Sequence, residues 1–292
     1  MTASLRCRLL MIHNPTAGRR RRRYLAAVLD ALACEGCTTT VMATERRGDA
    51  ERMAREAERV DAVVVAGGDG TVAEAANGLV GSAVPLAVVP LGTANVLAHE
   101  IGLPMAPASL ARAIARGPCR SVHAGEANGR RFMMMAGAGF DAGVVEQVKP
   151  GVKRWLGKGA YVLASVTRVL AYREERFRLD LDGSEHEAAS VIVAKGHFYA
   201  GRFVVAPMAS LDEPIFQVAL FEHPGRLPAM AAMAAMAAGR LDCLPGFRIL
   251  AARSVMIEGD AGAPIQADGD IVARVPARLA IAREPVRLVV AA

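Results

Sequence analysis

Two patterns of apolar and polar positions alternate along the first 116 residues. Short apolar or β-branched runs, typical of strands buried on both faces, occur at Leu9–His13, Thr38–Ala43, Ala62–Ala66 and Pro85–Val89. Between these runs, apolar residues recur three and four positions apart, which predicts helices over Arg23–Ala33, Gly48–Val60, Val72–Leu79, Asn95–Ile101 and Ala108–Arg116. Asp49 is the candidate N-cap of the second helix. Strands and helices that alternate with short connections predict a parallel sheet covered by helices.

The pattern changes after about Cys119. Asn128-Gly129 and Asp182-Gly183 each separate two short extended runs, as in a β-hairpin. Further short strands are expected at Phe177–Leu181, Ala189–Ala194, Val204–Ala206, Phe216–Leu220, Ser254–Ile257 and Arg287–Val290. A long helical pattern, Lys153–Tyr172, interrupts them. We therefore expect an α/β domain over residues 1–118 and an antiparallel, β-rich domain over residues 119–292.

Composition is consistent with two folded domains and with a reducing compartment. Of the 292 residues, 53% are hydrophobic and 22% are charged, so the chain can bury a sizeable core. Five cysteines at scattered positions favour a cytoplasmic location over a disulfide framework. No segment reaches the roughly 18–20 apolar residues of a membrane span. Leu227–Ala238 (LPAMAAMAAMAA) is expected to be a packed helix, with membrane-surface contact as the alternative.

Positive charge is concentrated near the N-terminus. The formal net charge is +6, and the first sixty residues hold 12 arginines against 7 acidic residues, a local charge of +5. Such a segment favours an anionic partner. No aromatic residues are interleaved with Arg19–Arg23, so nucleic acid is disfavoured, and phosphates or an anionic membrane are favoured.

The stretch VAGGDGTV, Val65–Val72, joins a buried strand directly to a helix. Glycines at such a turn let the backbone approach an anion, and the start of the helix offers unpaired N–H groups. Neither the dinucleotide fingerprint nor a Walker loop is present. An aspartate inside a phosphate-binding turn is understandable if a divalent metal, or a group that orients the loop, lies beside it. The alternative is a tight strand–helix turn without a ligand.

Two further loops follow neighbouring strands in the same way. Val89–Pro104 begins VPLGTAN, and Asn14–Gly18 reads NPTAG. In open α/β sheets, ligands bind outside the carboxyl ends of the strands, so these loops are expected to face one crevice.

Taken in order and at this spacing, NPTAG, GGDGT and PLGTAN resemble the diacylglycerol kinase catalytic family, which includes bacterial lipid kinases and the sphingosine and ceramide kinases. GGDGT alone is shared with NAD kinases. The late turn Ile265–Asp270, IQADGD, resembles the family's Asp-Gly-Glu turn, so the resemblance is nearly end to end. It implies a Rossmann-like α/β domain of the NAD kinase and phosphofructokinase type, followed by a β-sandwich domain.

The resemblance also implies site residues. Those that would bind ATP are Asn14, Thr44, Gly67, Gly68, Asp69, Gly70, Thr71, Val72, Thr93 and Asn95. Asp268 would be the general base that accepts the proton of the lipid hydroxyl, with Asp270 beside it. From the residues alone, Asp268-Gly269 is a plain hairpin turn.

A smaller metal site, for Mg2+, is implied in Ser210–Phe216, SLDEPIF, with the Glu213 carboxylate and the backbone oxygens of Ser210 and Ile215 as ligands. Three departures from the family pattern occur. Pro214 stands at a usual glycine, Asp270 at a usual glutamate, and Val96 where many relatives carry aspartate.

The sequence thus predicts a cytoplasmic, ATP- and Mg2+-dependent lipid kinase that acts peripherally on a membrane lipid of the diacylglycerol or sphingoid/ceramide type, in phospholipid biosynthesis. The alternatives are an NAD kinase-like small-molecule kinase, disfavoured by NPTAG and PLGTAN, and a non-catalytic nucleotide-binding regulatory protein, disfavoured by Asp69 and Asp268. An exposed edge strand in the β-domain would allow a homodimer.

Overall fold

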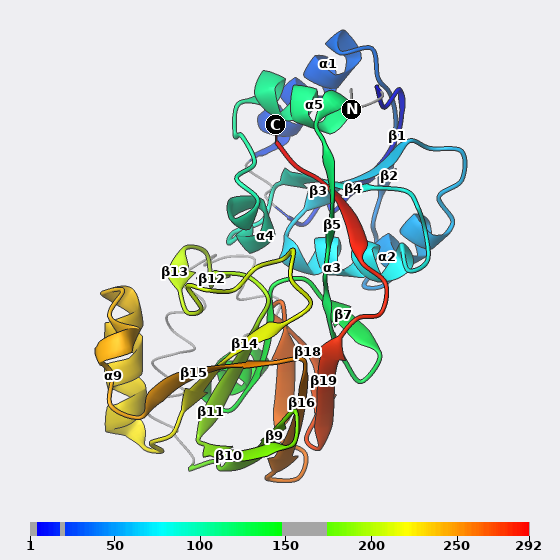
Figure 1. Ribbon diagram of the computed structural model, residues 1–292. Coiled ribbons are helices and arrows are strands. Elements are labelled where there is room, and N and C mark those ends of the chain that lie inside the picture. Colours follow the sequence, from blue (N-terminus) through cyan, green and yellow to red (C-terminus); the bar gives the residue numbers. More distant parts are fainter. Residues whose placement is uncertain (1–4, 18–20, 148–173, 292) are drawn as a thin grey trace. The chain divides into compact units, whose positions relative to one another are not determined.

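The computed structural model describes residues 5–17, 21–147 and 174–291. The chain forms two compact units, coloured along the sequence in Figure 1. Unit 1 holds the chain up to Val122 together with the segment from Arg283, and unit 2 holds His123–Ala282. The predicted helix Lys153–Tyr172 lies entirely outside the described residues.

Unit 1 is built on one six-stranded sheet with the order β2-β1-β3-β4-β20-β5. Its strands are β1 (Arg8–His13), β2 (Thr38–Ala43), β3 (Ala62–Gly67), β4 (Leu86–Pro90), β5 (Cys119–Val122) and β20 (Val286–Val289). The first four strands pair in parallel, as predicted, and every residue of β3 and β4 is buried. β20 runs parallel to β4 and antiparallel to β5.

Four of the five helices described in unit 1 pack in two pairs. The five are α1 (Arg22–Cys34), α2 (Asp49–Arg55), α3 (Asp69–Gly78), α4 (Val96–Glu100) and α5 (Pro107–Arg116). α1 packs on α5 and α2 on α3, and right-handed crossovers in this strand order place α1 and α2 on opposite faces of the sheet. The prediction of Asp49 as an N-cap is wrong: Gly48 has that position, and the Asp49 carboxylate accepts hydrogen bonds from the backbone N–H groups of Glu45 and Arg46.

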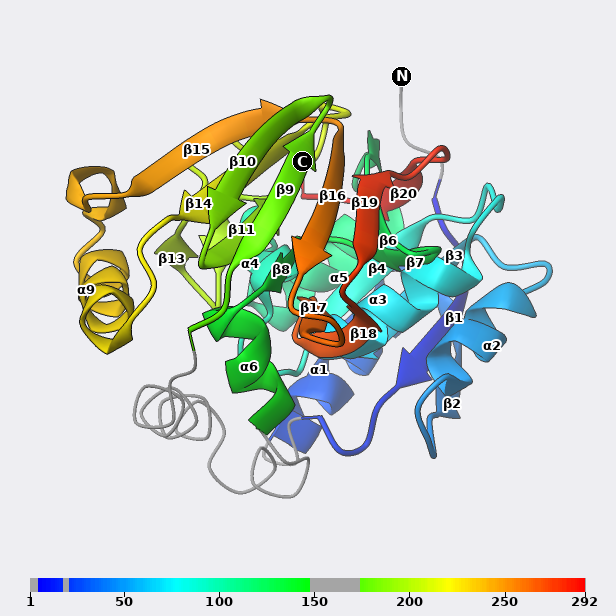
Figure 2. The same ribbon diagram turned by 90° about the horizontal axis from the view of Figure 1, so that it is seen from below.

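Unit 2 contains two six-stranded antiparallel sheets (Figure 2). One has the order β10-β9-β16-β19-β6-β7, with β10 (Ser184–Ala188), β9 (Phe177–Leu181), β16 (Ser254–Gly259), β19 (Ala277–Ile281), β6 (Gly125–Ala127) and β7 (Arg130–Phe132). The other has the order β15-β14-β11-β8-β17-β18, with β15 (Phe247–Ala252), β14 (Phe216–Phe221), β11 (Ser190–Ala194), β8 (Met135–Ala138), β17 (Pro264–Ala267) and β18 (Asp270–Arg274). A two-stranded ribbon, β12 (Phe198–Tyr199) and β13 (Phe203–Val204), is separate.

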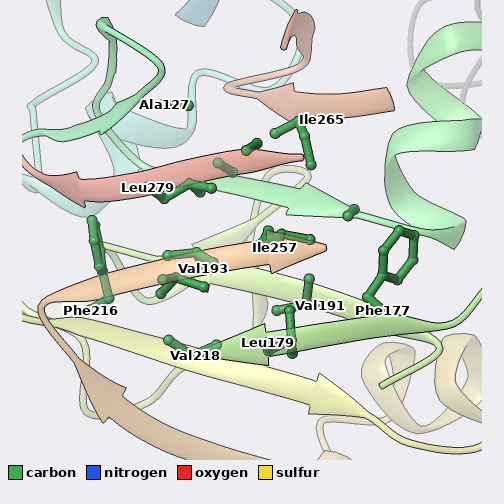
Figure 3. Close-up of a cluster of buried hydrophobic side chains, with 14 of the residues drawn as sticks. Ala127, Phe177, Leu179, Val191, Val193, Phe216, Val218, Ile257, Ile265 and Leu279 are labelled. Carbon is green, nitrogen blue, oxygen red and sulfur yellow. The ribbon is translucent and has the colours of Figure 1, made fainter. Parts of the chain in front are cut away.

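The core of unit 2 lies between these two sheets (Figure 3). Alternate residues of β9, β11, β14 and β16 are buried together, among them Phe177, Val193, Phe216 and Ile257. Two sheets that share one apolar layer in this way form a β-sandwich. The predicted α/β domain and β-sandwich are therefore confirmed.

Both predicted Asn-Gly and Asp-Gly hairpins are present, between β6 and β7 and between β9 and β10. Two strands differ from expectation. The expected strand at Val204–Ala206 is only the two-residue β13, and the expected last strand is β20, which belongs to unit 1 rather than to the β-rich unit. α6 (Phe140–Gln147) follows β8.

α9 (Arg226–Ala237) and the short 3-10 helix η2 (Leu241–Cys243) lie between β14 and β15. The expected packed helix is present in part: α9 contacts η2 and β13, and Pro228, Met233 and Met236 are half-buried, but no residue of α9 is fully buried. Across the described ranges, no helix is both long enough and apolar enough to span a membrane.

Candidate functional site

Three loops meet at the carboxyl edge of the sheet in unit 1. They follow the adjacent strands β1, β3 and β4, as the sequence predicted. The N–H of Asn14 donates to the carbonyl oxygen of Ala66 (3.0 Å), and the N–H groups of Leu91 and Gly92 donate to that of Gly67 (2.9 and 3.1 Å). Main-chain hydrogen bonds thus tie the NPTAG, GGDGT and PLGTAN loops to one another.

Gly68 and Gly92 bring two of these loops into direct contact. A Cβ atom built on Gly92 would lie 2.6 Å from the Cα of Gly68, and one built on Gly68 would lie 3.3 Å from the Cα of Gly92. The first distance is shorter than any carbon–carbon contact that packing tolerates. Position 92 therefore requires glycine, because the backbones of the two loops are in contact at this point.

Polar side chains join the same loops. The Asn14 Nδ2 group donates to Thr71 Oγ1 (3.0 Å), while Asn14 Oδ1 accepts hydrogen bonds from the N–H and hydroxyl of Thr16. Thr71 lies in the first turn of α3, and its N–H donates to the carbonyl of Gly68, as does that of Val72. Asn14 therefore fixes the first loop against the start of α3.

Asn95 has a strained backbone and an unpaired oxygen. Its φ is 49°, in the left-handed region, and its Nδ2 donates to the carbonyl oxygen of Gly92 (2.9 Å). That bond fixes the orientation of the amide, and Asn95 Oδ1 is left buried without a hydrogen-bond partner. A buried acceptor without a donor costs free energy, so a bound donor such as a hydroxyl, an amine or water suits this atom.

Asp69 points toward the start of α4. Its Oδ1 accepts a hydrogen bond from the N–H of Leu97 (3.3 Å). Burial raises the pKa of the Asp69 carboxyl, and main-chain N–H groups around the start of α4 oppose that rise. In this position the carboxylate ties the first turn of α3 to the start of α4.

The remaining nucleotide candidates lie at the same edge. The N–H of Thr44, directly after β2, donates to the carbonyl of His13 (2.9 Å). Gly70 is in the first turn of α3, and Thr93 is exposed in the second loop. Val96, at the family's aspartate position, is buried at the start of α4.

The arginine run predicted near this edge is only partly described. Arg19 and Arg20 lie outside the described residues. Arg21 donates from Nη1 to the carbonyl of Pro90 (2.7 Å), at the end of β4. Arg21 therefore connects the start of α1 to the same sheet edge.

In unit 2, Asp268 occupies the tight turn between β17 and β18. Its φ is 47° and that of Gly269 is 86°, as in a type I′ hairpin turn. One carboxylate oxygen accepts the N–H of Met133 (2.6 Å), and the other accepts those of Met134 (2.9 Å) and Met135 (3.1 Å). Three main-chain donors hold this carboxylate in place. Asp270 begins β18 and is half-buried.

The three expected metal ligands are brought together, but around a different cation. The carbonyl oxygens of Ser210, Glu213 and Ile215 all accept hydrogen bonds from Nζ of Lys195. Two of the expected metal ligands, the carbonyl oxygens of Ser210 and Ile215, are therefore already bound to an ammonium group, while the third, the Glu213 carboxylate, belongs to an exposed side chain. The site does not fit a metal ion. Within the described ranges, no group of three or more His, Cys, Asp or Glu side chains is placed to hold one either.

Sequence reasoning missed a second polar cluster in unit 2. The buried carboxylate of Asp141, in α6, accepts hydrogen bonds from the Tyr199 hydroxyl and from Gln266 Nε2, the latter at 2.6 Å. Burial raises the pKa of the Asp141 carboxyl, and the two hydrogen bonds oppose that rise. Gln266 Oε1 in turn accepts the N–H of Gly269 (3.0 Å), so this cluster supports the turn that carries Asp268. The only signal in the sequence was an aspartate beside an apolar, glycine-rich strand.

Two family models match the chain. The model "Diacylglycerol kinase catalytic domain" matches residues 8–127, and "YegS C-terminal NAD kinase beta sandwich-like domain" matches residues 134–291. Together they cover both units.

Named relatives agree with the family models. The chain is 31% identical over 223 residues to the diacylglycerol kinase of Bacillus subtilis, covering 74% of each chain. It is 33% identical over 224 residues to a probable lipid kinase YegS-like of Pseudomonas aeruginosa, covering 74% of this chain and 72% of that one. A crystal structure of a putative diacylglycerol kinase from Bacillus anthracis has the same fold, with a TM-score of 0.81, 23% identity, and coverage of 98% of this chain and 96% of that one.

Proposed function

Because the chain belongs to the diacylglycerol kinase family and is a lipid kinase, we propose that it transfers the γ-phosphate of ATP to a hydroxyl group of a membrane lipid. The acceptor is of the diacylglycerol or sphingoid/ceramide type, and the product is a phospholipid. Diacylglycerol is the acceptor in the names of several relatives.

The observation that carries this proposal is the close contact of Gly68 with Gly92 beside the unpaired Asn95 oxygen. It makes a cradle of main chain at the carboxyl edge of a parallel sheet, where open α/β folds bind ligands. The residues therefore fit a nucleotide. Main-chain N–H groups at a helix start suit its phosphates, and the buried acceptor suits one of its hydroxyl or amino groups.

The predicted nucleotide residues contribute to this site as follows. Gly67 to Val72, together with Thr93, hold the phosphates, and Asn14 fixes the first loop through its bond to Thr71. Thr44 lies at the same edge. Asn95 Oδ1 accepts a hydrogen bond from the nucleotide or from a water bound to it, because an acceptor would repel a phosphate oxygen.

Mg2+ held with the nucleotide beside Asp69 would screen the phosphate charges. The chain contributes the orientation of that loop, through the contact of Asp69 with the start of α4. No part of the Ser210–Ile215 loop is assigned to this ion, because its carbonyls bind Lys195.

Asp268 is the proposed base for the attacking hydroxyl, with Asp270 beside it. Its three main-chain donors fix its position. Phosphoryl transfer through a loose transition state asks for a positioned acceptor more than for a strong base, because the hydroxyl proton leaves late. A carboxylate that is held rigidly suits that role.

The test measures transfer of labelled γ-phosphate from ATP with Mg2+ to a panel of lipids in mixed micelles. The panel includes diacylglycerol, a sphingoid base, ceramide and phosphatidylglycerol. Asp268→Asn should lower the rate by about 10²–10⁴-fold. Asp182→Asn is the matched control: Asp182 has the same turn conformation (φ 51°), and its carboxylate also accepts two main-chain N–H groups, of Arg253 and Ser254.

A rate lost in Asp268→Asn and kept in Asp182→Asn, with both proteins folded, supports the base. Equal losses in both variants would mean that Asp268 only supports the fold. If no lipid is labelled although ATP binds, the non-catalytic nucleotide-binding alternative replaces the kinase proposal.

The proposal includes peripheral contact with the membrane through unit 2. α9 has no buried residue, and its Leu227 and Met230 are 78% and 53% exposed. Phe203 of β13, which packs near α9, is 42% exposed, and Met208 is 77% exposed. A group of exposed apolar side chains of this kind marks an interaction surface, and a lipid substrate supplies an apolar partner.

Localisation and assembly complete the proposal. All five cysteines are free thiols, which supports a reducing, cytoplasmic compartment. β10 and β15 are edge strands of the two sheets in unit 2, so either can pair with a second copy. Analytical ultracentrifugation would measure whether a homodimer forms.

A further inference from the structure

Lys195 is a lysine in an unusual place. It follows β11, a central strand of its sheet, and its relative exposure is 0%. Its main-chain N–H donates to the carbonyl of Met134 (2.8 Å), so the backbone continues the sheet at this point. Lysines are almost never fully buried unless their charge is satisfied.

The charge of Lys195 is satisfied by main chain. Its Nζ donates to the carbonyl oxygens of Ser210 (2.8 Å), Glu213 and Ile215 (3.1 Å). An ammonium group has three N–H donors, so three carbonyl acceptors use all of them. The loop from Ser210 to Ile215 therefore wraps around one cationic atom.

The carboxylates of Glu213 and Asp212 lie near this amine and attract its positive charge. Glu213 is itself exposed, so its carboxylate acts at the surface while its carbonyl points inward.

We propose that the ammonium group of Lys195 is the built-in cation of the Ser210–Ile215 loop, and that this loop folds without a divalent metal ion. Carbonyl and carboxylate oxygens are the ligands of hard cations such as Mg2+ and Ca2+. Here the side chain delivers a positive charge to two of the oxygens expected to bind a metal, the carbonyls of Ser210 (2.8 Å) and Ile215 (3.1 Å). The inference does not depend on the catalytic proposal, because it concerns the folding of one loop.

The first arm of the test uses the wild-type protein without nucleotide. Its melting temperature is measured in EDTA and then with excess Mg2+ or Ca2+. We expect the same melting temperature in all three conditions. A melting temperature that falls in EDTA and recovers with either ion would overturn the proposal, whether or not any variant folds.

The second arm compares two neutral substitutions of Lys195. Lys195→Met fills the space but removes every donor, so we expect the melting temperature to fall by roughly 5–10 °C, with no response to metal. Lys195→Asn shortens the side chain and leaves room beside the three carbonyls. We expect it to melt lower in EDTA and to regain part of the loss with Mg2+ or Ca2+, saturably.

Folded Lys195→Asn protein that gains nothing from either ion would contradict the view that these carbonyls form a cation site. If Lys195→Asn does not fold even with metal, Lys195→Met decides that arm. A melting temperature of Lys195→Met equal to that of the wild type would show that the loop needs no cation, and would also overturn the proposal. Kinase activity is not needed for any of these readouts.

Discussion

At the scale of the residue, Gly92 offers the sharpest test of the nucleotide cradle. A methyl group at this position would lie 2.6 Å from the Cα of Gly68 and 2.8 Å from Asn95 Oδ1. Gly92→Ala must therefore push the two loops apart. We expect ATP affinity, measured by isothermal titration calorimetry, to fall at least about tenfold, which corresponds to about 1.4 kcal/mol.

The control for this substitution is Gly36→Ala. Gly36 follows α1, has a φ of 84° and has no atom within 4 Å of an added Cβ. The change strains the backbone and lowers stability without touching the loops. ATP affinity should survive in Gly36→Ala, and an unchanged affinity in Gly92→Ala would remove the cradle from the nucleotide site.

Three residues in similar turns show how far the sequence can assign roles. Asn128, Asp182 and Asp268 all precede glycine in tight turns, with φ values of 46°, 51° and 47°. Each side chain accepts main-chain N–H groups from a neighbouring segment. Their local sequences predict the turn in every case, but they cannot distinguish a catalytic carboxylate from a structural one. Only the resemblance singled out Asp268.

Lys195 was missed for a related reason. A lysine after an apolar strand normally marks the point where the chain reaches solvent, because lysines are mostly exposed. Its role depends on three carbonyls that lie 15 to 20 positions later in the chain. No periodicity of side chains reports where main-chain carbonyls converge. The sequence analysis therefore named residues of this loop as ligands but did not predict that Lys195 is the cation they contact.

At the scale of the element, α9 is the clearest target. Leu227→Lys combined with Met230→Lys places two charges on its most exposed apolar positions. Each lost apolar side chain removes about 1.5–3 kcal/mol of possible burial. We expect association with zwitterionic liposomes, which do not attract the added lysines, to fall at least about tenfold when measured by co-sedimentation. Phosphorylation of a short-chain, water-soluble acceptor should be unchanged.

Met105→Lys is the control for α9. Met105 is also an exposed methionine, 48% exposed, but it lies in unit 1, before α5. Liposome binding should survive this change. Equal binding by the wild type and the α9 double variant would mean that another surface contacts the lipid.

The elements with strong periodicity were the ones that the sequence predicted well. β3 and β4 are apolar at nearly every position and are buried throughout, and α5 has its apolar residues on one face. α9 was less predictable, because alanine and methionine are apolar on every side of the helix, a pattern that is the same for a buried helix and for one that contacts lipid. Burial is decided by neighbours, which this segment's own sequence does not contain.

At the scale of the whole molecule, unit 2 is inserted between two strands of one antiparallel pair. β5 ends at Val122, and Val122 lies opposite Val286 at the start of β20. The sequence analysis assigned the whole segment after residue 118 to the second domain. A four-residue strand carries no signal of its partner, and the partner here is more than 160 positions away. The return of the chain to unit 1 was therefore not predictable from local pattern.

This topology predicts that residues 1–122 cannot fold well by themselves. Without β20 they lack the strand between β4 and β5, whose Val286, Leu288 and Val289 are buried. Losing three such side chains costs on the order of 5 kcal/mol, which rivals the stability of a whole domain. A second protein should restore the sheet: residues 1–122, then Asn-Gly, then residues 286–292. Because Val122 and Val286 are directly opposite, a two-residue type I′ turn can join them.

We expect the joined protein to melt cooperatively, as followed by circular dichroism, and the fragment of residues 1–122 to melt far lower or to lack a transition. Leu288→Asp in the joined protein is the control, because it keeps the chain length but places a charge where Leu288 is fully buried. It should behave like the short fragment. If the fragment and the joined protein melt alike, β20 contributes little to unit 1, and the first 122 residues are a self-sufficient domain. If only the joined protein is stable, nucleotide binding can be measured on unit 1 in isolation. The Gly92→Ala comparison can then be repeated there, free of any effect from unit 2.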